Sequence, residues 1–204
     1  PFYVCSGTTT TWTAIASGGA GGYTFSWSNG STASSIIAGG ETNCVTVTDN
    51  AGCKFTDCKT SIALVDLTVS LPSKTVCFGS TGTLTASVSG GLAPYSYLWS
   101  GGETTSSITK IPGTYSVTVT DSILCGAIAT ATITQAADLV IGFSDIHNVS
   151  CKGGGNGLAT VVVSGGVNPY SYFWSPGNMN TDLVYGLSAG TYFITITDAI
   201  GCTK

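Results

Sequence analysis

The sequence predicts an all-β protein built from three tandem antiparallel β-sandwich repeats, and three observations support this prediction. A Ser-Gly-Gly turn followed by an aromatic strand that ends in Trp-Ser occurs three times, with the tryptophans at Trp27, Trp99 and Trp174. Within each repeat, apolar residues alternate with Thr and Ser, which is the pattern of a strand with one buried face. No segment of ten residues combines a helical 3.6-residue period with good helix formers. The regular elements should therefore be strands throughout.

The period of the repeat sets the domain boundaries. The tryptophans are 99 − 27 = 72 and 174 − 99 = 75 positions apart. We therefore assign residues 1–66, 67–137 and 138–204 to the first, second and third repeats. The first repeat should lack the lead-in strand that opens the other two, and the third should lack the last strand. We expect the continuing chain to supply the missing strand, and the alternative is a strand donated by the next subunit of a head-to-tail filament.

The expected strands follow one another in the same order in each repeat. In the second repeat they are a lead-in strand at 67–71, an alternating strand at 83–88, the aromatic strand at 95–100, a fourth at 115–120 and a last strand at 126–134. The Ser-Gly-Gly triplet between the second and third of these is a turn or bulge signal. The tryptophan of each aromatic strand should lie between the two sheets, and we expect Trp12 to be inside as well. The linkers Leu67–Lys74 and Ala137–Asn148 are apolar and strand-like, so the array should be semi-rigid.

These motifs resemble a known family. A cysteine, Ser-Gly-Gly, Pro-Tyr-Ser-Tyr-x-Trp-Ser, a Gly-Thr-Tyr strand and Thr-Asp-x-x-Gly-Cys follow one another as in the SprB-type repeat. The resemblance implies a fold similar to immunoglobulin-like and PKD-like domains. It also implies a place in a very long surface adhesin of gliding Bacteroidetes, exported by the type IX system. The first repeat departs from the pattern, with Gly22 in place of the proline and 41–43 reading Glu-Thr-Asn.

The cysteines predict disulfide bonds and an oxidising compartment. There are eight in the chain, with no Cys-x-x-Cys pair and a single histidine, His147. Each repeat has a start cysteine near its beginning and a turn cysteine after the Thr-Asp turn. Because their separations are 53 − 5 = 48, 125 − 77 = 48 and 202 − 151 = 51, we expect one bond within each repeat. The expected pairs are Cys5–Cys53, Cys77–Cys125 and Cys151–Cys202.

The two remaining cysteines belong to the first repeat. If its Thr-Asp turn centres on Ala51, residues whose numbers sum to 102 face each other across a hairpin. Cys44 then lies opposite Cys58, and we expect a cross-strand disulfide. A cross-link to another chain is the alternative.

Several polar and aromatic motifs have two readings. Asp49, Asp121 and Asp198 could be calcium ligands, but each has few acidic neighbours, and a turn held by the aspartate side chain is the simpler account. The aromatic strand could bind glycans if it were exposed. On it, Leu98 and Phe173 point away from the predicted core, with Ser26 at the matching place in the first repeat.

Short sequence motifs mark three candidate glycosylation sites. Asn29 and Asn148 begin Asn-x-Ser sequons, and Ser122 lies in an Asp-Ser-Ile motif of the kind that carries O-glycans in Bacteroidetes.

Composition argues against several functions. Six basic residues and a net charge of −4 disfavour nucleic acid and anionic membrane surfaces, and no apolar run is long enough to span a bilayer. Catalysis needs a base beside a nucleophile or two facing carboxylates, and neither pattern is present. We expect no enzyme activity, no metal and no cofactor.

The sequence thus predicts a structural and adhesive segment of a long extracellular filament or gliding adhesin at the cell surface. Its partners should be neighbouring repeats or subunits of the same filament, with a surface polysaccharide as a further candidate. The alternative function is a carbohydrate-binding or spacer module of a secreted hydrolase.

Overall fold

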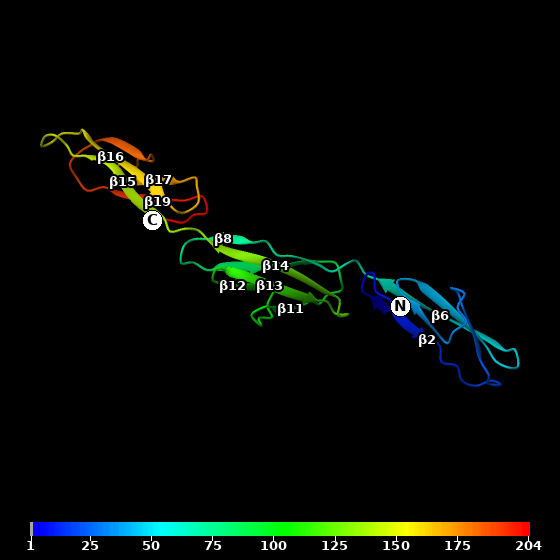
Figure 1. Ribbon diagram of the computed structural model, residues 1–204. Coiled ribbons are helices and arrows are strands. Elements are labelled where there is room, and N and C mark those ends of the chain that lie inside the picture. The colour runs from blue at the N-terminus through cyan, green and yellow to red at the C-terminus, as the bar shows by residue number, and fades with distance from the viewer. Residues whose placement is uncertain (1) are drawn as a thin grey trace. The chain divides into compact units, whose positions relative to one another are not determined.

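The computed structural model describes residues 2–204, and all regular secondary structure in that range is β-strand (Figure 1). Within these residues, no helix could cross a membrane. The prediction of an all-β array of immunoglobulin-like repeats is confirmed at the level of fold class.

Contacts divide the chain into two compact units. The first contains the chain up to Ser70 together with Ala86–Ser106 and Ser116–Ala129. The second contains Leu71–Thr85, Ser107–Tyr115 and Thr130–Lys204. Each unit therefore holds one terminal repeat and a part of the central repeat, including one of the two junctions between repeats.

The first repeat has two sheets, of order β1-β6-β5-β3 and β2-β4. Its strands are β1 (Phe2–Val4), β2 (Thr10–Thr13), β3 (Thr24–Trp27), β4 (Ser35–Ala38), β5 (Thr42–Thr48) and β6 (Lys54–Ala63). Strand β1 runs parallel to the end of β6, whereas the other pairs are antiparallel.

The second repeat has the same arrangement with one more strand pair. Its sheet orders are β11-β13-β14-β8, β12-β9 and β10-β7. The strands are β7 (Thr68–Ser70), β8 (Lys74–Val76), β9 (Gly82–Thr85), β10 (Ser87–Ser89), β11 (Ser96–Trp99), β12 (Ser107–Lys110), β13 (Gly113–Thr120) and β14 (Gly126–Gln135). The segment expected to be a linker thus contributes β7, which pairs with β10 as a strand of the repeat itself.

The third repeat has sheets of order β15-β16-β18 and β17-β19. Its strands are β15 (Val140–His147), β16 (Gly157–Ser164), β17 (Ser171–Ser175), β18 (Leu183–Leu187) and β19 (Phe193–Thr197). In the second repeat the lead-in chain leaves β10 after three residues and then pairs with β14 as β8. In the third, β15 stays on β16 from Val140 to His147, with a bulge after Phe143.

The tryptophan of each aromatic strand is buried. Trp27, Trp99 and Trp174 are 6%, 2% and 2% exposed. Each indole N–H donates to a backbone carbonyl six or seven residues later: Ala33 at 2.8 Å, Thr105 at 2.7 Å and Thr181 at 2.9 Å. Strand alternation places the tryptophan inward, and the hydrogen bond satisfies its polar atom there.

Candidate functional site: the junctions between repeats

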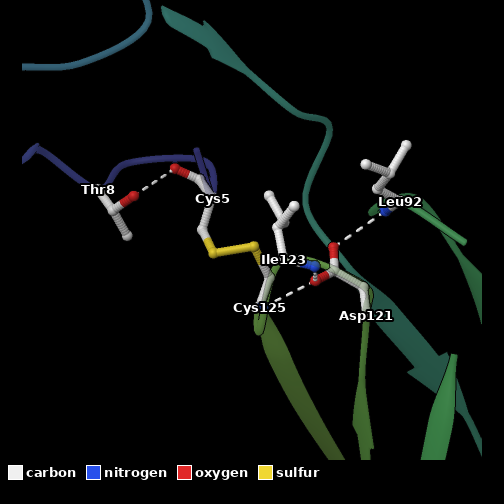
Figure 2. Close-up of a disulfide and its surroundings, with 6 residues drawn as sticks. All are labelled: Cys5, Thr8, Leu92, Asp121, Ile123 and Cys125. Carbon is white, nitrogen blue, oxygen red and sulfur yellow. Dashed lines mark hydrogen bonds between the residues drawn. A yellow bond between two sulfur atoms is a disulfide. The ribbon is translucent and has the colours of Figure 1, made fainter. Parts of the chain in front are cut away.

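Each Thr-Asp turn is organised by its aspartate. In the second repeat, Oδ1 of Asp121 accepts hydrogen bonds from the amides of Ile123 (3.0 Å) and Cys125 (2.8 Å), and Oδ2 accepts one from Leu92 (2.9 Å) (Figure 2). The amide of Ser122 in turn donates to the carbonyl of Leu92 at 2.9 Å. One carboxylate therefore fixes its own turn and joins it to the residue that follows Ser-Gly-Gly.

The same network is present in the other repeats. Asp198 accepts from Ile200, Cys202 and Val167 at 2.8–3.0 Å. Asp49 accepts from Ala51, Cys53 and Ala20 at 2.9–3.0 Å. The aspartates act as backbone acceptors, and no group of three His, Cys, Asp or Glu side chains in the described chain is arranged to hold a metal.

The network also lowers the pKa of each carboxyl. For Asp121 and Asp198, burial alone would raise the pKa, but the hydrogen bonds from backbone amides outweigh burial and hold it below the ordinary value. For Asp49, the amide of Ala20 is the main cause of a lowered pKa. Hydrogen bonds to the ionised form favour that form, so the three turns are built for carboxylates.

The Ser-Gly-Gly turn receives the segment that arrives from the preceding repeat. The amide of Gly91 donates to the carbonyl of Val65 at 3.0 Å. A Cβ on Gly90 would collide with the carbonyl oxygen of Asp66, and one on Gly91 would lie 2.9 Å from the Leu67 side chain. Both glycines have positive φ, at 73° and 62°, so the turn needs glycine for its backbone as well as for this close approach.

The second junction repeats these contacts. The amide of Gly166 donates to the carbonyl of Ala137 at 2.9 Å, and Gly165 lies against the carbonyl of Asp138. There Lys204 also pairs with Asp138 at 3.0 Å. The two junctions are thus built from equivalent residues.

A disulfide crosses each junction. Cys5, the start cysteine of the first repeat, bonds to Cys125, the turn cysteine of the second, with Cα atoms 5.6 Å apart (Figure 2). Cys77 bonds in the same way to Cys202 of the third repeat, with Cα atoms 5.5 Å apart. Cys53 and Cys151 are free and exposed. The three pairings expected within repeats, Cys5–Cys53, Cys77–Cys125 and Cys151–Cys202, are therefore wrong.

The parallel pairing of β1 with β6 explains why. Val4 lies opposite Ala63, so Cys5 follows at the far end of β6. Cys53 immediately precedes Lys54, the first residue of this ten-residue strand. A strand of that length separates its two ends by about 30 Å, whereas the Cα atoms of a disulfide lie about 4.4–6.8 Å apart. The similar spacings of 48, 48 and 51 positions follow from the repetition of the sequence and do not indicate a bond within each repeat.

The hairpin of the first repeat has the expected register. Thr48 pairs with Lys54, Thr46 with Thr56, and Cys44 with Cys58. The structure joins Cys44 and Cys58 by a disulfide across this pair.

The remaining candidate residues lie at the surface. Leu98 and Phe173 are 57% and 51% exposed, on the opposite strand face from the buried tryptophans. The three candidate glycosylation residues, Asn29, Ser122 and Asn148, are also exposed.

The first repeat also contains a cleft of about 600 Å³ that the sequence patterns did not predict, lined by residues of β2, β3, β5 and β6. Phe55, Asp57 and Lys59 line it from β6. Counted from the turn cysteine, the same positions of β14 are three alanines, at 127, 129 and 131. The sequence therefore contained an indication of this cleft, because two charged residues stand on a strand face that is apolar in the second repeat.

Two further residues give this cleft its chemical character. Asn43 is 3% exposed, and its Nδ2 has no hydrogen-bond partner among the described residues. Trp12, expected inside, is only partly buried and borders the cleft together with Trp27.

Comparisons with known proteins agree with the repeat pattern. No curated protein matches the chain. Among solved structures, domains I67–I69 of titin in an E-to-A mutated variant cover 99% of this chain and 92% of their own, at 10% identity and a TM-score of 0.44. Extracellular domains 3–5 of Drosophila OTK cover 100% and 91%, at 12% identity and a TM-score of 0.33. Neither TM-score reaches 0.5, so the fold class rests on the chain's own strands.

The SprB repeat matches the chain at two places, residues 75–104 and 144–179. These segments contain two of the start cysteines, two Ser-Gly-Gly turns and the two aromatic strands that carry Trp99 and Trp174. At these two places the chain is similar to the SprB repeat, as its motifs predict.

Proposed function

We propose that this chain is a structural and adhesive segment of a long extracellular filament or gliding adhesin, displayed on the cell surface and without enzymatic activity. The carrying observation is that both junctions between repeats are closed by a disulfide and by the same backbone contacts. The resemblance to adhesins of gliding Bacteroidetes exported by the type IX system supports this role. The disulfides support an oxidising compartment outside the cytoplasm.

The disulfides give the chain a mechanical property that suits this role. One bond closes the loop from Cys5 to Cys125 and the other closes the loop from Cys77 to Cys202, so the loops overlap between Cys77 and Cys125. When the chain is pulled at its ends, the shortest covalent path passes from Cys5 to Cys125 through the first disulfide and from Cys77 to Cys202 through the second. Between the two disulfides it follows only the overlap, which spans 125 − 77 = 48 positions. The other parts of the two loops carry no load.

The limit on extension can be estimated from the length of a stretched residue. The oxidised path between Cys5 and Cys202 reaches about 180 Å at about 3.5 Å per residue, against about 690 Å when the disulfides are reduced. A filament built in this way resists lengthening even if its repeats unfold.

Single-molecule force spectroscopy tests this property. The oxidised chain, held at its two ends, should rupture or stop lengthening near the shorter limit, and the same chain in reductant should extend to near the longer one. The double variant Cys5→Ser/Cys77→Ser is the matched control. Without reductant it should extend to within about 50 Å of the longer limit, because its Cys44–Cys58 disulfide still closes 14 positions. Full extension of the oxidised chain would contradict the proposal. An antibody against the chain should also label the outside of intact producing cells, and labelling only after permeabilisation would contradict a surface role.

The second candidate function is carbohydrate binding, and the cleft of the first repeat is the observation that favours it. A sugar ring offers an apolar face that can stack on an indole and hydroxyl groups that can bond to polar side chains. The cleft combines Trp12 with Asn43, Asp57 and Lys59. The buried amide of Asn43 would gain the hydrogen-bond acceptor that it lacks within the described protein.

A glycan array distinguishes the two functions. Under the second candidate, the chain should bind one class of polysaccharide, and Trp12→Ala and Asp57→Ala should each reduce that binding at least tenfold. Leu98→Ala, an exposed change in another repeat, is the control and should leave binding unchanged. If the chain binds no glycan, carbohydrate binding is contradicted and the structural role is unaffected.

A further inference from the structure

Two cysteines remain free in a chain whose other start and turn cysteines are joined between repeats. Cys53 is the turn cysteine of the first repeat and Cys151 is the start cysteine of the third. At both junctions, the start cysteine of one repeat bonds to the turn cysteine of the next. By the same rule, the partner of Cys151 is a turn cysteine and the partner of Cys53 is a start cysteine.

The loop around Cys53 already has the geometry of the bonded turn cysteines. Oδ1 of Asp49 accepts from the amide of Cys53 at 2.9 Å, where Asp121 and Asp198 accept from Cys125 and Cys202 at 2.8 Å. Bonding therefore needs no rearrangement of the turn. The backbone of Cys53 is held in the same way as at the two closed junctions.

The loop around Cys151 likewise matches the bonded start cysteines. The carbonyl of Cys151 accepts from the amide of Gly154 at 2.9 Å. The carbonyls of Cys5 and Cys77 accept in the same way from Thr8 at 3.1 Å and Ser80 at 3.0 Å. Each free thiol thus lies in the local structure of its bonded counterparts.

The Ser-Gly-Gly turn beside Cys53 is formed but open. Gly18 and Gly19 have φ of 84° and 63°, close to the values at the two closed junctions. A Cβ on Gly18 would meet nothing within 4 Å, whereas the matching Gly90 and Gly165 lie against the carbonyls of Asp66 and Asp138. A cleft of about 360 Å³, bordered by these glycines, Asp49 and Cys53, stands at this place.

We propose that Cys53 and Cys151 are the two halves of a third inter-repeat disulfide, formed between the third repeat of one copy of this chain and the first repeat of a second copy. Because the two sites differ, the contact is heterologous, and repeated contacts of this kind give a head-to-tail polymer. This inference rests on the proposed role in a filament and adds the covalent link between its subunits.

The bond forms by oxidation with a low-molecular-weight disulfide. The thiolate of Cys53 attacks the small disulfide and releases one small thiol, and the thiolate of Cys151 then displaces the second. Two protein thiols become one protein disulfide, and one small disulfide becomes two small thiols. Protons and electrons balance without a metal or an enzyme.

Two single variants test the pairing. Oxidised glutathione should convert the wild-type chain into multiples of 20.6 kDa on a non-reducing gel, and reductant should return them to the monomer. Cys53→Ser alone and Cys151→Ser alone should each remain monomeric. An equimolar mixture of the two variants should form a dimer and stop there, because it contains one Cys151 thiol and one Cys53 thiol that can react. Peptide mapping of that dimer should find Cys53 joined to Cys151.

Other outcomes would overturn the inference. Dimers of Cys151→Ser by itself would show a symmetric Cys53–Cys53 bond, and a wild-type chain that stays monomeric after oxidation would show that the sites do not meet. Tryptophan fluorescence checks that both serine variants are folded, which we expect because both cysteines are exposed. Electron microscopy of the chain without a disulfide between copies tests the filament role separately from the Cys53–Cys151 bond. Filaments without the disulfide would contradict only this inference.

Discussion

The carboxylate of Asp121 and the amide of Leu92 are joined by a hydrogen bond of 2.9 Å across 29 positions of sequence. The bond fastens the Thr-Asp turn to the Ser-Gly-Gly turn, at the end of the repeat where the chain from the preceding repeat arrives. Because Cys125 follows in the same turn, the carboxylate also positions the sulfur that crosses the junction. The function of the aspartate is therefore to hold a covalent connector in place.

The pH dependence of stability should reveal these carboxylates. Because their pKa values are lowered in the folded protein, their contribution is complete above the ordinary value and is lost as the pH falls through the folded pKa. We expect the free energy of unfolding to decrease below about pH 4. Asp121→Asn should lose about 1–3 kcal/mol at neutral pH and show a shallower decrease in acid. Urea unfolding at a series of pH values measures both, and equal acid slopes for variant and wild type would refute the assignment.

Gly91→Ala should weaken the first junction more than a glycine change elsewhere. Its Cβ would lie 2.9 Å from both Oδ2 of Asp121 and the Leu67 side chain, in a backbone with a φ of 62°. Gly102→Ala is the matched control, since its φ is 90° and its Cβ would meet nothing within 4 Å. The difference between the two variants in thermal unfolding isolates the contact from the backbone strain. Equal losses would mean that the contact with the arriving segment is unimportant.

Trp99→Ala should destabilise the second repeat by about 3–5 kcal/mol, because it leaves a large cavity between the sheets. The adjacent variant Leu98→Ala should cost little, since Leu98 is 57% exposed and Trp99 is 2% exposed. Iodide should quench the fluorescence of Trp27, Trp99 and Trp174 only weakly, whereas the partly buried Trp12 should be more accessible. Strong quenching of all the tryptophans would place them at the surface and reverse the assignment of the two strand faces.

Non-reducing peptide mapping should find Cys5 with Cys125, Cys77 with Cys202 and Cys44 with Cys58. In the chain-entropy model, a loop of about 120 residues contributes roughly 5 kcal/mol. Cys77→Ser and Cys202→Ser should therefore have equal effects on thermal unfolding, and the double variant should add nothing. Recovery of a peptide pair joined by a Cys77–Cys125 bond would contradict this pairing and support disulfides within repeats.

The sequence did not predict the short strands β1 and β8, or β12 and its counterparts β4 and β18. By itself it determined most of the other strands, the buried tryptophans and the register that places Cys44 opposite Cys58. All of these depend on local information, namely the two-residue alternation of a strand and the turn that joins neighbouring strands. A hairpin partner lies a few residues away, so its position can be counted from the turn.

Only the tertiary structure decided the partners of Cys5 and Cys77. Their bonds depend on which end of a sandwich each cysteine occupies, and this is set by the parallel pairing of β1 with β6 and of β8 with β14. Residues about 60 positions apart form these pairs, as Phe2 and Ser61 do, and no local pattern marks them. The spacing of 48 between start and turn cysteines is the same whether the bond closes a repeat or joins two, so counting could not distinguish the two cases. The ten-residue length of β6 excludes a bond within the first repeat. The contact of the arriving segment with Gly90 and Gly91 allows a bond between the first and second repeats.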